Sequence, residues 1–371
     1  MSTMIQILAF LAGLLTVLLT LSSALSTFVL PRAARSQLNR IVFGLLRRLF
    51  DFVLHFVKTY NNRDTIMAYY APLGLMLLVP TWYILITLGY AAMYWALGVG
   101  AFPSMLRMSG SSLLTLGVES NNVLLVILLE FTESMLGLIL VALLIAYLPT
   151  LYAAFSRREQ VVNMLEVRAG SPPSALEMIL RFNRNQGLEK LADYWKVWEA
   201  WFADVEESHT TLPALIFFRS PRAENSWVTA AGAVLDAASI TLSAIDIPYE
   251  ISAALSIRAG YLAFRRIANY FDIPNPQEPQ FPEVPICVDR AEFDQVLDKL
   301  AEAGLPLKAD REKAWRDFAG WRVNYDRTLI LLCGLVMAPQ ATWSSDRAPE
   351  YHPTPMLISK KHKLHADKES A

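Results

Sequence analysis

The sequence predicts an all-α membrane protein in which three transmembrane helices precede an α-helical domain. Of the 371 residues, 54% are hydrophobic, a larger share than in most soluble chains. The apolar residues concentrate in the first 155 positions, whereas the remainder has the mixed composition of a globular domain. Three apolar stretches are each long enough to cross the hydrocarbon of a bilayer as a helix. These predicted spans are Ile5–Leu30, Ile66–Val99 and Val123–Phe155.

Residues 1–30 hold the first predicted span. A cleaved signal peptide is the competing interpretation, but no basic residue precedes the apolar run, and the run exceeds a signal core. Pro31 ends the span, and basic residues then alternate with apolar ones at helical spacing through residues 31–65. This pattern predicts a basic amphipathic helix on the cytoplasmic side of the membrane. Two interpretations stay open for it, a solvated linker helix and a helix that binds anionic lipids.

The second and third spans frame residues 66–158. Arg157 and Arg158 follow the third span at once, which places its end in the cytoplasm by the positive-inside rule. The connection from Gly100 to Asn122 carries one basic residue, Arg107, and is expected outside. We therefore expect a multi-pass protein of the cell (inner) membrane, with an external N-terminus and a cytoplasmic C-terminal domain.

The connection between these two spans has an unusual pattern. Gly98, Gly100 and Pro103 interrupt the second span, and Pro103 to Leu114 predicts a short amphipathic helix. The tripeptide Thr115-Leu116-Gly117 follows it, directly ahead of the third span. Non-helical backbone at bilayer depth is tolerated only where protein buries it or water lines it. The pattern predicts a re-entrant hairpin between the second and third spans.

This hairpin resembles the pore loop of potassium channels of the two-transmembrane type, in which a short helix leads into Thr-Val-Gly-Tyr-Gly. The resemblance covers about Ile66 to Arg158 and implies a homo-tetramer that conducts a monovalent cation such as potassium. It implies a selectivity filter of Thr115, Leu116, Gly117 and Val118, built from carbonyl oxygens. The next residue departs from the signature, since Glu119 stands where a second glycine is expected. Its carboxylate is expected at the outer mouth, where it attracts cations.

The third span carries three further candidate residues of the pore. Glu130 and Glu133 lie three positions apart in an apolar helix, hence on roughly one face. Carboxylates within a membrane are costly, so these are expected to line a vestibule or to brace the short helix. The alternative, favoured for Glu133, is a structural hydrogen bond behind the filter. Gly137 lies deeper in the same span. It is either a hinge of the pore-lining inner helix or a site where helices approach closely.

Residues 159–343 predict an α-helical cytoplasmic domain, and residues 344–371 predict a disordered tail. Val228–Ile245 is apolar but contains Asp236, and is expected to be a packed helix of this domain rather than a span. Ala309–Met337 reads as one helical pattern. The tryptophans of Leu188–Val205 are expected to pack in a core.

The sequence offers no catalytic or cofactor-binding constellation. Its formal net charge is -1, which gives no reason to expect nucleic-acid binding, and its five histidines and two cysteines lack metal-ligand spacing. We therefore expect no enzyme activity and no cofactor. The ligand or protein partner of the cytoplasmic domain stays unknown. The alternative function is a non-conducting, membrane-anchored sensor or scaffold.

Overall fold

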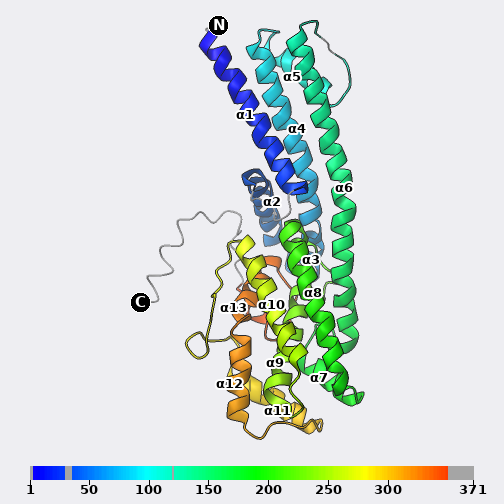
Figure 1. The fold of residues 1–371 in the computed structure, drawn as a ribbon, viewed down its shortest axis with the longest axis vertical. Coiled ribbons are helices and arrows are strands. Elements are labelled where there is room, and N and C mark those ends of the chain that lie inside the picture. Colours follow the sequence, from blue (N-terminus) through cyan, green and yellow to red (C-terminus); the bar gives the residue numbers. More distant parts are fainter. Residues whose placement is uncertain (1–2, 30–35, 119–120, 350–371) are drawn as a thin grey trace. The chain divides into compact units, whose positions relative to one another are not determined.

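The computed structural model describes residues 3–29, 36–118 and 121–349 (Figure 1). Within these ranges the protein is all-helical, and its one β-type pairing is an isolated bridge between Ile245 and Leu307. Four helices are long and apolar enough to cross a membrane. The chain divides into two compact units. We call Met1–Leu49 with Tyr69–Ala153 the apolar unit, and Phe50–Ala68 with Ala154–Ala371 the helical domain.

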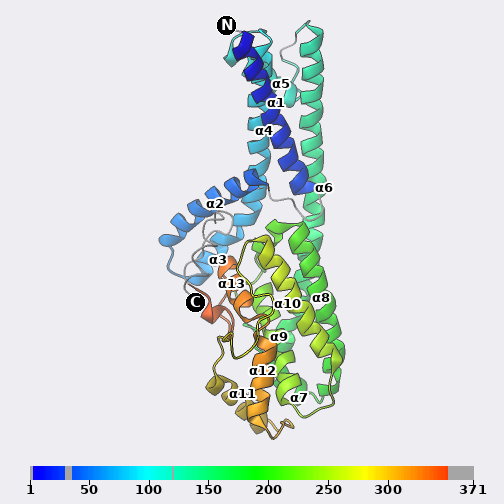
Figure 2. The same cartoon turned by 60° about the vertical axis from the view of Figure 1, so that its left-hand side comes forward.

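Four helices make up most of the apolar unit: α1 (Thr3–Phe28), α4 (Tyr70–Ala96), α5 (Phe102–Leu113) and the first part of α6 (Leu124–Ala169). Helices α1 and α4 lie side by side in both views (Figures 1 and 2). Gly13 and Gly89 meet at their crossing, where a β-carbon on either residue would collide with backbone of the other helix. Small residues therefore let these two apolar helices pack backbone to backbone, as is common in membrane proteins.

Helix α2 (Gln37–His55) falls within the predicted basic amphipathic segment and is amphipathic, with one wide apolar face. Phe43 on this face is buried and packs edge-to-face on the Tyr70 ring. Leu45 and Phe52, on the other side of the same face, are more than half exposed. Helix α3 (Tyr60–Ala68) follows. Together with α4 it makes up the stretch Tyr60–Ala96, which has the length and composition of a span and contains the predicted start at Ile66.

The helical domain contains the last residues of α2, all of α3 and the last part of α6. In the described residues, seven further α-helices follow α6. These are α7 (Ala175–Arg184), α8 (Leu191–Thr211), α9 (Trp227–Ala244), α10 (Ile251–Tyr270), α11 (Arg290–Glu302), α12 (Arg311–Arg322) and α13 (Asp326–Val336).

Helix α9 is the centre of the domain. It is the fourth helix with the length and composition of a span, yet its whole apolar window is buried inside the domain. Its alanines, serines and one glycine allow α10, α12 and α13 to pack closely on it. The tryptophans of α8 lie in the same core, with Trp195 and Trp198 fully buried. Both features agree with what the sequence predicts for these helices.

One predicted helix is two helices in the structure. Ala309–Met337 reads as a single pattern, but α12 ends at Arg322 and α13 begins at Asp326. Between them the Asn324 side chain donates to the carbonyl oxygens of Gly320 (3.0 Å) and Trp321 (3.2 Å). Asparagine competes in this way for the carbonyls that would continue a helix.

Candidate functional site

Helix α5 lies between α4 and α6 and is held there by its serines. Ser109 Oγ lies 3.0 Å from the Thr87 carbonyl oxygen of α4 and also contacts the Glu133 carboxylate of α6. Ser134 Oγ of α6 donates to the Ser112 carbonyl oxygen at 2.7 Å. The face of α5 that carries these bonds is buried, and Ser109 and Ser111 are at most 4% exposed.

The order of these contacts fixes the direction of α5. Ser109 lies level with Glu133, and Leu113 lies level with Gly137, so α5 and α6 run in the same direction. Gly137 is the fourteenth residue of α6, so the end of α5 lies about 20 Å from the start of α6. The chain must therefore travel back by that distance between Leu113 and Leu124, outside any helix.

The end of α5 is a Schellman-type turn with threonine in the position that usually holds glycine. The Leu116 N–H donates to the Ser111 carbonyl oxygen at 2.8 Å, and the Thr115 N–H donates to that of Ser112 at 3.0 Å. Thr115 adopts the left-handed region, with φ of 56°. A β-branched residue is uncommon there, and such outliers concentrate at functional sites.

The loop that follows, Leu114–Val118, is exposed along its whole length. Leu116 and Val118 are 64% and 70% exposed. Gly117 has φ of +65° with open space around its α-carbon. The Val118 N–H donates to Ser111 Oγ at 2.8 Å, which ties the loop back to α5. The four predicted filter residues, 115–118, thus lie in one irregular segment, whereas Glu119, the residue predicted for the outer mouth, lies outside the described residues.

The two carboxylates of α6 have different surroundings. Glu133 is fully buried and accepts hydrogen bonds from Tyr94 Oη of α4 at 2.9 Å and from Ser109 of α5. It therefore ties three helices together behind the exposed loop. Glu130 is half-buried, and the described residues give its buried Oε1 no hydrogen-bond partner.

Gly137 is a point of close helix contact. A β-carbon there would overlap the Leu113 carbonyl oxygen. The Gly137 carbonyl oxygen in turn accepts a hydrogen bond from Tyr83 Oη of α4 at 2.8 Å. Of the two interpretations that the sequence leaves open, this geometry supports close approach.

Sequence reasoning missed the partners of Glu133. It expected the carboxylates of the third span to line a vestibule or to brace the short helix, but it did not single out Ser109 and Tyr94, which donate to Glu133. The signal was present in part, because Met105, Ser109, Ser112 and Leu113 recur at helical spacing and share the buried face of α5.

No protein-family model, no curated protein and no solved structure matches the chain. The case for a function therefore rests on the geometry of α5 and of the loop Leu114–Val118, and on the residues that carry the channel resemblance.

The helical domain holds a buried charge cluster around Arg322 of α12. Its guanidinium pairs with Asp236 of α9 and Asp326 of α13 and donates to the Trp343 carbonyl oxygen. Although burial alone would lower the pKa of Arg322, the two carboxylates raise it well above its ordinary value. Burial also raises the pKa of the neighbouring Cys287 thiol to about 12, so this thiol is protonated at neutral pH.

These groups have no open position for chemistry. Cys287 donates from its backbone N–H and its thiol to the two Asp326 oxygens, each at 3.0 Å. The part of the chain that the structure describes contains no group of three His, Cys, Asp or Glu side chains that would hold a metal ion. We interpret the cluster as a structural link between α9, α12 and α13.

Proposed function

We propose that the chain is a subunit of a cation channel in which residues Thr115, Leu116, Gly117 and Val118 form the selectivity filter. The observation that supports this most directly is the exposed, irregular loop Leu114–Val118. It begins at the end of α5, level with Gly137 and about 20 Å from the start of the apolar helix α6. With α4 and α6 as spans, this loop and α5 would form a re-entrant hairpin within the bilayer.

Backbone of this kind cannot face lipid. Each peptide group without a partner in hydrocarbon costs several kcal/mol, so such a loop must face protein or water. One chain leaves the loop uncovered, and a ring of chains would cover it while its carbonyl oxygens face a shared axis. The resemblance to two-transmembrane potassium channels gives four chains as the expected number.

The charge distribution of the hairpin suits a cation. The C-terminal end of α5 leads into the loop, and the negative end of a helix dipole favours positive charge nearby. Glu119 follows the loop in the sequence and would add a ring of carboxylates at the mouth. Rings of carbonyl and carboxylate oxygens are the usual devices for cation entry and selection, with potassium the ion that the resemblance implies.

The same proposal includes an orientation in the membrane. Arg157 and Arg158 follow the apolar half of α6, and basic residues also cluster between α1 and α4. By the positive-inside rule both segments belong on the cytoplasmic side, which makes the helical domain cytoplasmic.

Cation flux into liposomes reconstituted with the purified chain tests this function. We expect potassium flux in the wild type, with Gly117→Ala abolishing it, because alanine is strained at φ of +65°. Gly98→Ala is the matched control, since Gly98 also has positive φ and open surroundings but lies outside the loop. Its flux should stay within twofold of the wild type.

The other outcomes are equally informative. Equal sodium and potassium fluxes, both lost in Gly117→Ala, would indicate a non-selective pore with Glu119 in place of the second filter glycine. An absence of flux at every pH and voltage applied would contradict a channel and favour the alternative, a membrane-anchored sensor or scaffold. The mass of the purified assembly, counted in subunits, tests the tetramer separately.

A further inference from the structure

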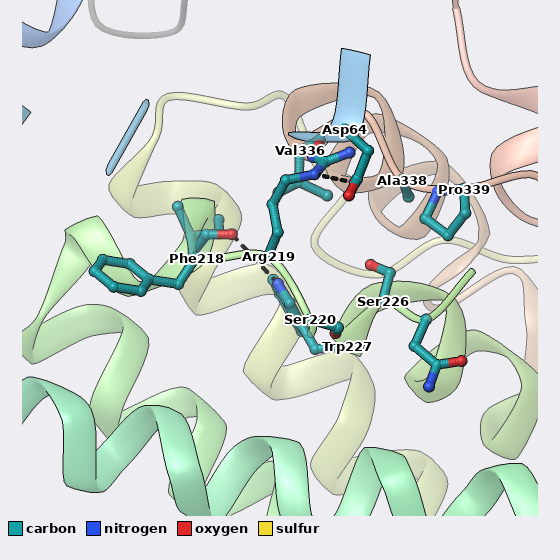
Figure 3. A pocket seen from close by; sticks show the side chains of 11 residues that line it. Asp64, Phe218, Arg219, Ser220, Ser226, Trp227, Val336, Ala338 and Pro339 are labelled. Carbon is teal, nitrogen blue, oxygen red and sulfur yellow. Dashed lines mark hydrogen bonds and ion pairs between the residues drawn. The ribbon is translucent and has the colours of Figure 1, made fainter. Parts of the chain in front are cut away.

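Arg219 binds the segment that leads into α4. It follows the 3₁₀ turn Pro213–Phe217 of the helical domain, and its side chain is 10% exposed. The guanidinium pairs with Asp64 of α3 (Figure 3). It lies 3.2 Å from Tyr60 Oη of the same helix. It also donates to the carbonyl oxygens of Val336 (2.6 Å) and Met337 (2.8 Å) at the end of α13. One side chain thus joins α3 to the end of α13 within the helical domain.

Polar bonds supply most of the attachment of α3. Met67 is the buried residue of this nine-residue helix, so apolar packing contributes little. A cavity of about 20 Å³, lined by Ser220 and Ser226 among others, lies beside Arg219 (Figure 3). It has room for about one water molecule. The Ser220 hydroxyl is buried and without a hydrogen-bond partner among the described residues. Arg219 therefore shares the polar attachment of α3 with Tyr60, whose hydroxyl donates to the Met337 carbonyl oxygen at 3.3 Å.

Helix α3 is nearly continuous with α4. A single residue, Tyr69, lies between them, and it keeps helical angles with φ of -81° and ψ of -14°. The Leu73 N–H donates to the Tyr69 carbonyl oxygen at 2.9 Å, so Tyr69 caps the first turn of α4. A displacement of α3 would pass to the start of α4 through this short connection.

The residue beside Arg219 is bound by the helix that carries the third span. The Phe218 carbonyl oxygen accepts a hydrogen bond from Arg158 of α6 at 2.6 Å, and the Phe218 ring lies 5.8 Å from that of Phe155. Arg158 is fully buried and also donates to the Leu215 carbonyl oxygen at 2.9 Å. Two consecutive residues therefore bind the chain segments that continue into the two helices flanking the exposed loop.

We infer that Phe218-Arg219 is the coupling element through which the helical domain controls the pore. Arg219 holds α3, which leads directly into α4, and Phe218 beside it is held by Arg158 of α6. This inference rests on the proposed channel function. It predicts that loss of the Arg219–Asp64 pair alters ion flux without altering the filter.

The test uses the full chain in liposomes and two readouts. Arg219→Gln and Asp64→Asn should each change potassium flux at least threefold in the same direction, with the double variant no further changed than either single one. Arg266→Gln is the matched control, because Arg266 pairs with Glu206 between α8 and α10, helices that do not continue into a span. Its flux should equal that of the wild type.

Hydrogen exchange in the same samples supplies a readout that does not depend on flux. In Arg219→Gln the amides of α3 should exchange at least tenfold faster, while those of α9 stay protected. If the wild type conducts and Arg219→Gln conducts equally well, the coupling is overturned. Unchanged amide hydrogen exchange in α3 of Arg219→Gln would overturn it too. An absence of wild-type flux would instead overturn the proposed function. Unchanged potassium-to-sodium selectivity in Arg219→Gln is required, because altered selectivity would place the effect at the filter.

Discussion

The carbonyl oxygen of Leu113, the last residue of α5, lies against the α-carbon of Gly137 on α6. No other amino acid fits there without moving one of the two helices, because any β-carbon would overlap that oxygen. The contact sets where α5 stops, and the exposed loop Leu114–Val118 begins one residue later. Gly137 thus acts on the proposed filter from outside it.

Gly137→Ala is therefore expected to destabilise the apolar unit by about 1–3 kcal/mol, the usual cost of overpacking. It should also reduce flux, because displaced α5 no longer presents the loop correctly. Thermal unfolding in detergent and liposome flux measure the two effects. Gly110→Ala is the control, since Gly110 of α5 has open space around it and should tolerate a methyl group. Equal behaviour of the two variants would contradict a packing role for Gly137.

Glu133 and Ser109 are expected to act as one unit. Replacing Glu133 by alanine leaves the buried Tyr94 hydroxyl without its acceptor, at a cost of about 1–3 kcal/mol, and leaves Ser109 with the Thr87 carbonyl oxygen alone. A double-mutant cycle of Glu133→Ala and Ser109→Ala should give a coupling energy of about 1 kcal/mol or more. Additive effects on unfolding would show that the two side chains do not depend on each other. Met135→Ala, at an exposed position of α6, supplies the reference variant.

The local sequence pattern was sufficient to predict the apolar helices and the short helix α5 between them. Three apolar stretches predict three spans, and Pro103 to Leu114 predicts a short helix that the structure has at Phe102–Leu113. These features depend on composition and spacing within one segment. The break at Asn324 was missed because a side chain there competes with the helical backbone, a local effect that apolar periodicity does not report.

Contacts between distant segments were beyond the sequence. Asp64 and Arg219 are 155 positions apart, yet their ion pair attaches α3 to the rest of the helical domain. Glu133 likewise finds Tyr94 and Ser109 on two other helices. Hydropathy identifies a carboxylate as unusual in a span but does not reveal which hydroxyls it meets, since that depends on how the helices pack. The residues that hold the site were therefore harder to predict than those that form it.

Arg322→Met is expected to destabilise the helical domain by about 3–5 kcal/mol. The change removes one buried cation and leaves Asp236 and Asp326 as unpaired buried carboxylates. Tryptophan fluorescence during thermal unfolding reports the effect, since Trp195 and Trp198 lie in the domain core. Arg266→Met breaks an exposed ion pair and should cost less than about 1 kcal/mol. A similar loss of unfolding free energy in the two variants would contradict the claim that the buried ion pairs of Arg322 stabilise the domain more than an exposed pair does.

His209 is expected to make the helical domain sensitive to mild acid. Burial lowers the pKa of this histidine well below its ordinary value, and the charge of Arg158 lowers it further. Its Nδ1 lies 2.8 Å from the Val205 carbonyl oxygen and its Nε2 lies 3.2 Å from Arg158 Nη1, which fits a neutral ring with the proton on Nδ1. The carboxylate that faces the same site, Glu159, is already paired with Arg158.

The sign of the pH effect follows from this depressed pKa. Below about pH 6.5 the unfolded chain binds a proton at His209 that the folded domain excludes, so stability falls by up to about 1.4 kcal/mol per pH unit. Above that pH His209 is neutral in both states, so its full contribution to the free energy of unfolding is present. Unfolding temperatures measured by tryptophan fluorescence from pH 7.5 to 5.0 should fall more steeply in the wild type than in His209→Gln. His55→Gln, at an exposed position on α2, should keep the wild-type slope. If His209→Gln also kept that slope, the buried histidine would not be the acid-sensitive group.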